Sequence, residues 1–177
     1  MAGRASSRRA PTVVVEQLEG LRYEPEFATE EEEAALVALF EQRQFSEIHM
    51  RGQVARRTVL HFGYRYDYEG WTLVPVEPLP PSATWVRDRA ATLAEVDPAA
   101  LAETLVTRYP PGAGIGWHRD APLFGPKVVG VTLLSGCSLR FQRRRAGIRE
   151  LHVLELAPRS AYVLAGSACQ RRSKTTR

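Results

Sequence analysis

Four short extended runs separated by turns fill much of the C-terminal half of the chain, and they constrain the fold more than any other feature. The runs are Lys127 to Leu134, Ser138 to Gln142, Leu151 to Leu156 and Ser160 to Leu164. Leu101 to Tyr109 predicts one further strand before them, and Arg143 to Gly147 predicts a charged hairpin tip. This spacing is typical of a barrel or sandwich. We therefore expect a mainly β chain with flanking helices (α+β), built on a jelly-roll, cupin-like core that holds a site in its mouth.

The size and composition of the chain predict a single domain. Its 177 residues, 44% of them hydrophobic, suffice for one domain with a core and are too few for two ordinary domains. No apolar run approaches a membrane span, and no signal peptide with a hydrophobic centre is found. Cys137 and Cys169 have no paired spacing, which argues against a disulfide framework or a cysteine zinc site. We expect a soluble, cytoplasmic monomer without a membrane partner, with the nucleus or an organelle left open.

Charge is distributed unevenly along the chain. Residues 1–15 include Arg4, Arg8 and Arg9 but no acid, and we interpret them as a disordered basic arm rather than as part of an organelle transit peptide. Residues 16–177 then form the domain. The net charge is +4 although the acids are concentrated at Glu26 and at Glu30 to Glu33. The remaining surface is basic, which suits binding to phosphate backbones and predicts a nucleic-acid partner.

The clearest helix start lies at Thr29. With Glu32 three residues later it makes a capping box, and the acids Glu30 to Glu33 suit the positive end of a helix. Leu36 and Phe40 recur at helical spacing and predict its buried face. We therefore interpret the glutamate run as structural and not as a metal site.

The other N-terminal elements have weaker signals. Thr12 to Leu21 is rich in β-branched residues and predicts a strand, with an extended segment continuing to Phe27. Pro75 to Pro81 predicts a proline-rich connector. Ser82 follows as the expected N-cap of a second helix that runs through Leu93.

Basic and aromatic residues alternate between Arg56 and Tyr68, which suits strands or an ordered hairpin. Tyr64, Tyr66 and Tyr68 share one side of an extended segment, where their rings can stack on nucleic-acid bases at roughly 1–3 kcal/mol each. The same rings can instead cover one half of a sheet, as aromatic residues in strands commonly do. The pattern leaves both interpretations open.

The stretch from Arg108 to Asp120 places an imidazole and a carboxylate two residues apart after a Gly/Pro-rich approach. In an extended segment the side chains of His118 and Asp120 point the same way, so both can bind one metal ion. One His, one carboxylate and a more distant His form the facial triad of non-haem Fe(II) oxygenases. The sequence supplies the first two ligands in that order, although such a pair alone is more often a capped turn or a salt link.

Three ordered blocks are more specific than this pair. They are Phe62-Gly63-Tyr64-Arg65-Tyr66, then Arg108-Tyr109-Pro110-Pro111-Gly112 with His118-Arg119-Asp120, and then Pro158-Arg159-Ser160-Ala161-Tyr162-Val163-Leu164-Ala165-Gly166-Ser167. Together they resemble the AlkB family of Fe(II)- and 2-oxoglutarate-dependent dioxygenases. The resemblance implies a double-stranded β-helix over about residues 101–177 that holds the iron, with a nucleotide-recognition lid over about residues 51–70.

The resemblance also implies roles for individual residues. His118 and Asp120 match the first two iron ligands and are the expected catalytic and metal-binding residues. Tyr109 matches the tyrosine that contacts the cosubstrate 2-oxoglutarate, and Thr107 stands where many members have an asparagine that shares this task. Fe(II), 2-oxoglutarate and O2 are the implied cofactors.

The lid is expected to bind the substrate through Tyr64, Tyr66 and Arg57. It packs a flipped base, because an oxidising iron centre cannot reach a base atom inside the stack. The implied reaction hydroxylates an N-methyl group on the base, and the adduct decomposes to formaldehyde and the repaired base. DNA and RNA remain equally open.

The family's third iron ligand is a histidine that follows the strand ending near Gly166. None of the four histidines of this chain, His49, His61, His118 and His152, stands there. His152 shares a strand side with Leu154 and Leu156, which predicts a core or surface strand residue rather than a ligand. Cys169 is nearer the expected place, but a thiolate beside an O2-activating iron is itself oxidised.

The tail has an Arg-x-Ser-x-Thr-x-Arg spacing similar to the family's last strand, where two arginines clamp the 2-oxoglutarate carboxylate. On this match Arg171 and Arg177 bind the cosubstrate. Arg172, Lys174 and Thr176 would then occupy inner positions that should be apolar. Either a deletion kept the Arg pair, or the tail is an unrelated basic segment.

Three functions follow from these features. The first is an Fe(II)/2-oxoglutarate-dependent dioxygenase that demethylates alkylated bases in DNA or RNA. The second is an impaired or inactive homologue that still binds nucleic acid, since a ligand is missing. The third is an oxygenase acting on protein or small molecules, because barrel folds host many substrates.

Overall fold

The computed structural model describes residues 12–13, 18–50, 52–67, 72–118, 125–145, 148–166, 168 and 172–176. In chain order its elements are β1 (Thr12–Val13), β2 (Leu21–Glu24), α1 (Glu30–Glu41), β3 (Ser46–Met50), β4 (Gln53–Phe62), β5 (Tyr64–Asp67), β6 (Thr72–Pro75), η1 (Pro81–Ala83), α2 (Thr84–Ala94), η2 (Pro98–Ala100), β7 (Thr104–Arg108), β8 (Gly114–His118), β9 (Lys127–Val131), β10 (Cys137–Arg145), β11 (Ile148–Leu156), β12 (Ala161–Ala165) and β13 (Arg172–Thr176). The strands expected in the C-terminal half are all present, with ends shifted by a few residues.

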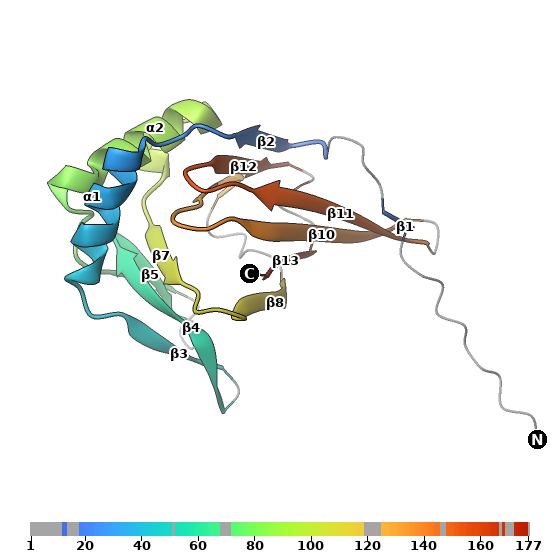
Figure 1. Cartoon of the computed structure of the whole chain (residues 1–177), viewed down its shortest axis with the longest axis horizontal. Helices are drawn as coiled ribbons and strands as arrows, with labels where there is room; N and C mark the ends of the chain where they lie inside the picture. The colour runs from blue at the N-terminus through green and yellow to red at the C-terminus, as the bar shows by residue number, and fades with distance from the viewer. Residues whose placement is uncertain are drawn as a thin grey trace, which may run out of the picture.

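Two sheets face each other and form the barrel core (Figure 1). The larger has the strand order β1-β11-β10-β13-β8, and the smaller has the order β2-β12-β9. Leu139, Phe141 and Leu156 from the larger sheet pack with Leu164 and Tyr162 from the smaller one. Burial of the alternate residues of each strand between two sheets explains why these runs are apolar at every second position. This arrangement confirms the expected jelly-roll core with flanking helices.

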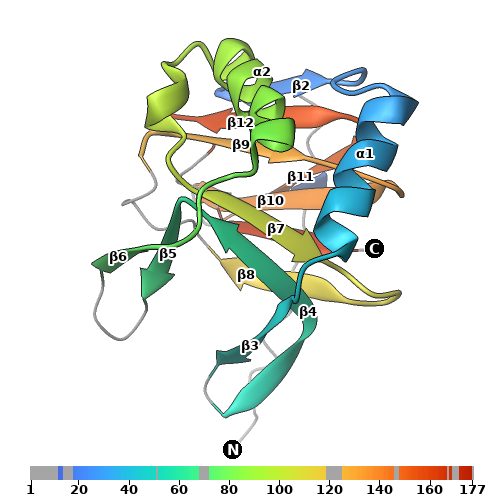
Figure 2. The ribbon, with the colours of Figure 1, turned by 90° about the vertical axis from the view of Figure 1, so that its left-hand side faces the viewer.

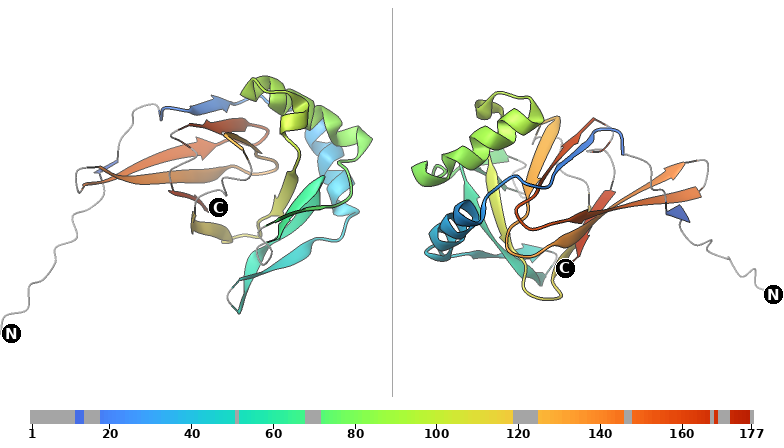
Figure 3. Two further views of the ribbon diagram at one scale, coloured as in Figure 1. Left: turned by 180° about the vertical axis from the view of Figure 1, so that it is seen from behind. Right: turned by 45° about the horizontal axis from the view of Figure 1, so that its top comes forward.

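A third sheet, β3-β4-β7, stands beside the barrel with the two main helices (Figure 2). Leu36 and Phe40 of α1 pack against Leu60 and Phe62 of β4. Helix α2 packs on the smaller sheet through a separate cluster that includes Val163 of β12. The helices thus gather at one end of the molecule, and the β10–β11 hairpin extends away from them (Figure 3). No described helix is long and apolar enough to cross a membrane.

Two N-terminal expectations were wrong. Instead of one strand over Thr12 to Leu21, β1 pairs parallel with β11, and β2 pairs with β12 after a turn. Gly20 allows that turn with a φ of +82°, where a Cβ would lie 2.0 Å from the carbonyl oxygen of Ala165. Ser82 is not an N-cap, because Pro81 starts a 3-10 turn and α2 begins only at Thr84.

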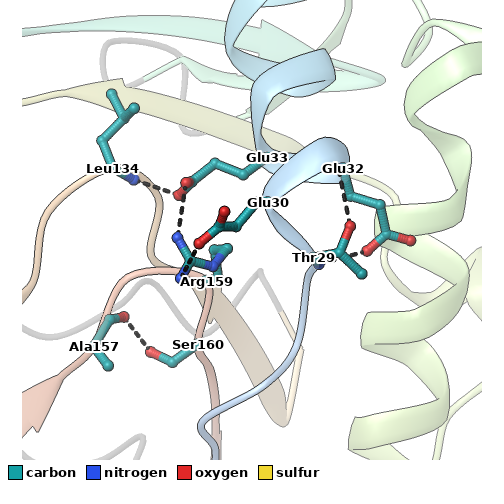
Figure 4. Close-up of polar contacts among 8 residues, drawn as sticks. All are labelled: Thr29, Glu30, Glu32, Glu33, Leu134, Ala157, Arg159 and Ser160. Atoms are coloured by element: carbon teal, nitrogen blue, oxygen red, sulfur yellow. Dashed lines mark hydrogen bonds and ion pairs between the residues drawn. The ribbon is translucent and has the colours of Figure 1, made fainter.

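The glutamate run anchors α1, as expected. Thr29 and Glu32 form the capping box, and Glu32 also accepts two hydrogen bonds from the Arg89 guanidinium, at 2.7 and 2.8 Å. Hydrogen bonds from Arg89 and from the Thr29 backbone lower the pKa of Glu32 from 4.5 to about 2. Glu33 accepts from the Leu134 backbone N–H at 2.6 Å and from Arg159 at 3.3 Å (Figure 4). These contacts bind the first turn of α1 to α2 and to two loops of the barrel.

The tail segment forms β13, a strand inserted between β10 and β8. Ser173 lies opposite Phe141 and Thr175 opposite Leu139, two residues whose side chains are buried in the core. Directly paired residues share a sheet face, so Ser173 and Thr175 hold the inner positions. The side chains of Arg172, Lys174 and Thr176, for which inner positions were expected, lie outside what the structure describes, while their backbone positions alternate with that of Thr175.

Candidate functional site

His118 ends β8, the edge strand of the larger sheet, directly opposite Ser173. It therefore belongs to the inner face that Ser173 shares with the fully buried Phe141. The Nδ1 atom of His118 lies 2.9 Å from the carbonyl oxygen of Gly116. Because a carbonyl oxygen only accepts, Nδ1 carries the proton in this hydrogen bond and Nε2 has the lone pair that a metal ion requires.

Three other members of the expected iron and 2-oxoglutarate site, Asp120, Arg171 and Arg177, lie outside the described residues, as does Cys169. Within the described part of the chain, no three His, Cys, Asp or Glu side chains gather closely enough to hold a metal ion. His118 fits iron because the hydrogen bond of Nδ1 to the Gly116 carbonyl orients its ring, so that Nε2 is the nitrogen that would coordinate the metal. The roles of the other residues stay predictions.

His152 is buried in the core, away from His118 in the sheet. It is 7% exposed and lies opposite Phe141, so one row of residues runs from His118 through Ser173 and Phe141 to His152. Three strand spacings, roughly 14 Å in total, separate the backbones of the two histidines. Two imidazoles on one metal ion need their nitrogens within about 4 Å of each other, since each metal–nitrogen bond is about 2 Å. The buried Phe141 lies between them in the row.

Strand β7 leads to the expected 2-oxoglutarate contacts. Thr107 lies opposite Val59 of β4, while its neighbour Val106 packs into the core cluster of helix α1. Thr107 therefore faces away from the helices, and Arg57, two residues before Val59, shares this face. Tyr109 directly follows β7 and is half-buried. The structure thus places Arg57 and Thr107 on one sheet face, with Tyr109 at its end.

The tyrosines of the lid differ in exposure. Strand β5 carries Tyr64 at 38% exposed and Tyr66 at 8%, and Tyr68 lies outside the described residues. Gly63 separates β4 from β5 with a φ of +78°, and a Cβ there would lie 2.1 Å from the carbonyl oxygen of Ala102. The low exposure of Tyr66 shows that it packs as a core residue, whereas the more exposed ring of Tyr64 is accessible from solvent.

The described arginines divide into two groups by position. Those near the helices form ion pairs with carboxylates, namely Arg22, Arg43, Arg87, Arg89 and Arg159. Apart from Arg22 of β2, the strand arginines with described side chains have no carboxylate within 4 Å among the described residues, namely Arg56, Arg57, Arg65, Arg108, Arg140 and Arg149. The excess positive charge is thus located on the sheets, while the helical end is largely neutralised.

One polar pair near the lid could not be predicted from the sequence. His61 of β4 places Nδ1 3.1 Å from Oε1 of Glu103, and their side chains are 22% and 13% exposed. The second carboxylate oxygen, Oε2, is buried without a hydrogen-bond partner in the described structure. His61 shares the sheet face of Val59, which also carries Thr107 opposite it. The partners are 42 positions apart in the sequence, which explains why no local pattern predicts the pair.

Comparison with known proteins agrees with this architecture. Residues 19–172 match the family model described as the 2OG-Fe(II) oxygenase superfamily. The solved structure of OsALKBH1 is similar with a TM-score of 0.71 at 12% identity, covering 89% of this chain and 85% of that one. A crystal structure of an oxidoreductase of the 2OG-Fe(II) oxygenase family from Burkholderia pseudomallei has a TM-score of 0.51 at 13% identity, covering 90% and 80%. A search of curated proteins finds no match.

Proposed function

The chain belongs to the 2OG-Fe(II) oxygenase superfamily, and from this premise we propose that it removes methyl groups oxidatively from alkylated bases in DNA or RNA. It is an AlkB-like oxygenase, and its superfamily uses Fe(II), 2-oxoglutarate and O2. The observation that carries the proposal is the continuous family match over residues 19–172, which spans the basic, aromatic lid and the strands around His118. The unneutralised arginines on the sheets support a polyanionic substrate.

The residues of the barrel have the task of holding the cofactors. When bound, Fe(II) and 2-oxoglutarate supply the oxidation by O2 that hydroxylates the methyl group. His118 binds the metal through Nε2, oriented by its hydrogen bond to the Gly116 carbonyl, and Asp120 is the second ligand. Tyr109, Arg171 and Arg177 hold the carboxylates of 2-oxoglutarate. Guanidinium groups suit that task because they donate two parallel hydrogen bonds to a carboxylate.

The residues of the lid have the task of holding the base. Tyr64 offers an exposed ring on which a flipped base stacks, and the buried Tyr66 fixes the strand that carries it. Arg57 lies on the face of Thr107 and near Tyr109, without a carboxylate partner among described residues, and is available to a phosphate. Packing a base against this face also excludes water from the oxidising centre.

A coupled turnover assay tests the proposal. Protein, Fe(II), ascorbate and 2-oxoglutarate are incubated with N-methylated or unmodified oligonucleotides of the same sequence, in both DNA and RNA form. We expect succinate to form faster with a methylated strand, and His118→Ala to abolish the difference. Equal succinate formation with and without the methyl group would show that these bases are not the substrate.

A second candidate is a homologue that binds nucleic acid but turns over slowly or not at all. It is favoured by the position of His152, which lies in the core across three strand spacings from His118. Loss of a partner that only orients a metal ligand costs about 10–100-fold in affinity or activity, so the loss of an imidazole ligand costs more. Salt-dependent oligonucleotide binding together with absent succinate formation would identify this case. Turnover without any oligonucleotide binding would instead indicate an oxygenase of proteins or small molecules.

A further inference from the structure

The outer face of the larger sheet carries a second cluster of positive charge, separate from the lid. We propose that this face binds the phosphate backbone of the nucleic-acid strand that flanks the target base. The choice of nucleic acid as partner rests on the proposed function. The surface is defined here as the outer positions of β11, β10 and β13 together with Trp117 of β8.

Burial defines which side of the sheet is outside. On β10, Leu139 and Phe141 are buried in the core while Arg140 between them is exposed. On β11, His152 and Leu156 are buried while Arg149 and Val153 are exposed. The exposed residues therefore share the face that is turned away from the smaller sheet.

Backbone pairing brings further cationic residues to the same positions. Lys174 lies opposite Arg140, and Arg144 lies opposite Arg149. Arg172 lies opposite Gln142, which is also an outer position. The backbone register alone therefore assigns these cationic residues to the outer rows of the sheet.

Negative charge is scarce on this face. Across the outer positions of β11, β10 and β13, the acidic residue is Glu155, whose two oxygens accept hydrogen bonds from the Ser138 hydroxyl at 2.7 Å. Arg140 has no carboxylate within 4 Å in the described structure. An exposed guanidinium of this kind suits the two-oxygen fork of a phosphate.

Trp117 connects this surface to the site. It immediately precedes the inward-facing His118 on the edge strand β8, so it belongs to the opposite face. The Arg149 guanidinium lies 5.7 Å from the centre of its ring. A strand whose base enters at His118 can therefore pass over the edge of the sheet to an aromatic ring and a row of cations. The combination of stacking and phosphate contacts is typical of single-stranded nucleic-acid binding.

The test compares charge reversals at two ends of the full-length protein. Arg140→Glu/Arg149→Glu alters the proposed surface, and Arg22→Glu/Arg87→Glu makes the same change in net charge at the helical end, where both arginines already have carboxylate partners. Unmodified fluorescent single strands of about 5 and about 20 nucleotides report binding by anisotropy, since single-strand sites span roughly 4–16 nucleotides. Arg140→Gln/Arg149→Gln serves as a milder variant, and circular dichroism checks folding.

We expect Arg140→Glu/Arg149→Glu, the sheet variant, to weaken binding of the long strand about tenfold or more, with little effect on the short strand. The slope of the logarithm of the binding constant against the logarithm of the salt concentration should fall in magnitude by about 1–2. The helical-end variant should leave the long strand within about threefold of wild type, because screening limits distant charges. Equal losses in both variants, or no loss in the sheet variant, would overturn the proposal. The proposal would also be overturned if the protein bound phosphatidylserine vesicles more tightly than the long strand and if this vesicle binding depended on Arg140 and Arg149.

Failure of the proposed function gives a different result. One possible result is that succinate fails to form with every methylated strand while only the sheet variant binds the long strand more weakly. That result would support the proposed binding surface and contradict demethylation. If methylated short and long strands are both demethylated and neither variant changes the affinity for the long strand, the result supports demethylation and contradicts the proposed binding surface.

Discussion

His118 is the residue for which geometry and chemistry agree most closely. The hydrogen bond from Nδ1 to the Gly116 carbonyl selects the tautomer in which Nε2 can bind a metal ion. Ser173 opposite it comes from the last strand, so the C-terminal segment stabilises the position of His118. His118 is thus positioned both by a hydrogen bond within its own strand, β8, and by pairing with the neighbouring strand, β13.

His118→Ala should lower the affinity for Mn(II), used as a redox-stable substitute for Fe(II), by more than about 100-fold, because loss of a directly bound imidazole exceeds the usual cost of losing an orienting partner. Isothermal titration calorimetry measures the change. His49→Ala is the matched control, since that histidine is 70% exposed on β3 and pairs with Glu47. Equal metal affinity in wild type and His118→Ala would remove His118 from the site.

The pair of His61 and Glu103 makes a separate prediction about stability. His61→Ala leaves a carboxylate that is only 13% exposed with neither oxygen hydrogen-bonded, and should lower the free energy of unfolding by about 1–3 kcal/mol. Urea denaturation measures it, and the double variant His61→Ala/Glu103→Ala should be more stable than His61→Ala alone. Purely additive losses would mean that the two side chains do not interact.

Individual site residues are predictable from sequence to the extent that their signal is local. His118 and Tyr109 belong to a short motif, so their positions at the ends of β8 and β7 follow from the pattern. The exposure of Tyr64 and the burial of Tyr66 depend on what packs against β5, which alternation alone cannot specify. Glu103 meets His61 only through the pairing of β4 with β7.

At the scale of elements, helix α1 is held at its first turn. Hydrogen bonds from the Arg89 guanidinium and from the Thr29 backbone N–H lower the pKa of Glu32 to about 2, below its ordinary value of 4.5. A carboxyl group with a lowered pKa in the folded state stabilises the protein above its unfolded pKa, and this contribution is lost as the pH falls through the folded value. The first turn of α1 is therefore acid-sensitive between about pH 4.5 and pH 2.

Glu32→Gln should reduce this acid sensitivity. Glutamine keeps the hydrogen bond to the Thr29 N–H but does not titrate, so the variant is less stable than wild type at neutral pH and the difference shrinks as the pH falls from about 4.5 to 2. Thermal denaturation at a series of pH values measures the difference. Glu41→Gln, at the other end of α1, is the control. A constant difference across this range would show that the Arg89 contact does not act through charge.

The boundaries of helices and strands were predictable where a local sequence motif marks them. The register in which the strands pair was not predictable. The capping box at Thr29 fixes the start of α1 locally, and the apolar runs mark β9 to β12. The turn at Gly20 and the inner positions of Ser173 and Thr175 depend on distant strands, β12 and β10. A shift of one residue in register exchanges the two faces of a strand, so the sequence of the tail alone cannot specify which residues occupy the inner positions.

At the scale of the whole molecule, charge is separated between two ends. Ion pairs with Glu32, Glu77 and Glu95 neutralise arginines near the helices, including Arg22 of β2, while strands of the larger sheet and of the lid carry arginines without carboxylates among the described residues. A net charge of +4 is modest, but its location on the sheets that carry His118 produces a local field suited to a polyanion. We infer that the lid, about residues 51–70, and the barrel, about residues 101–177, act as one unit within residues 16–177.

The most direct measurement is mass spectrometry of a methylated oligonucleotide after incubation with the protein. We predict that the methyl group is lost and formaldehyde released only when Fe(II), 2-oxoglutarate and O2 are all present, and that His118→Ala prevents the loss. An unchanged strand under conditions where wild-type protein binds both Mn(II) and the oligonucleotide would contradict the proposed demethylation.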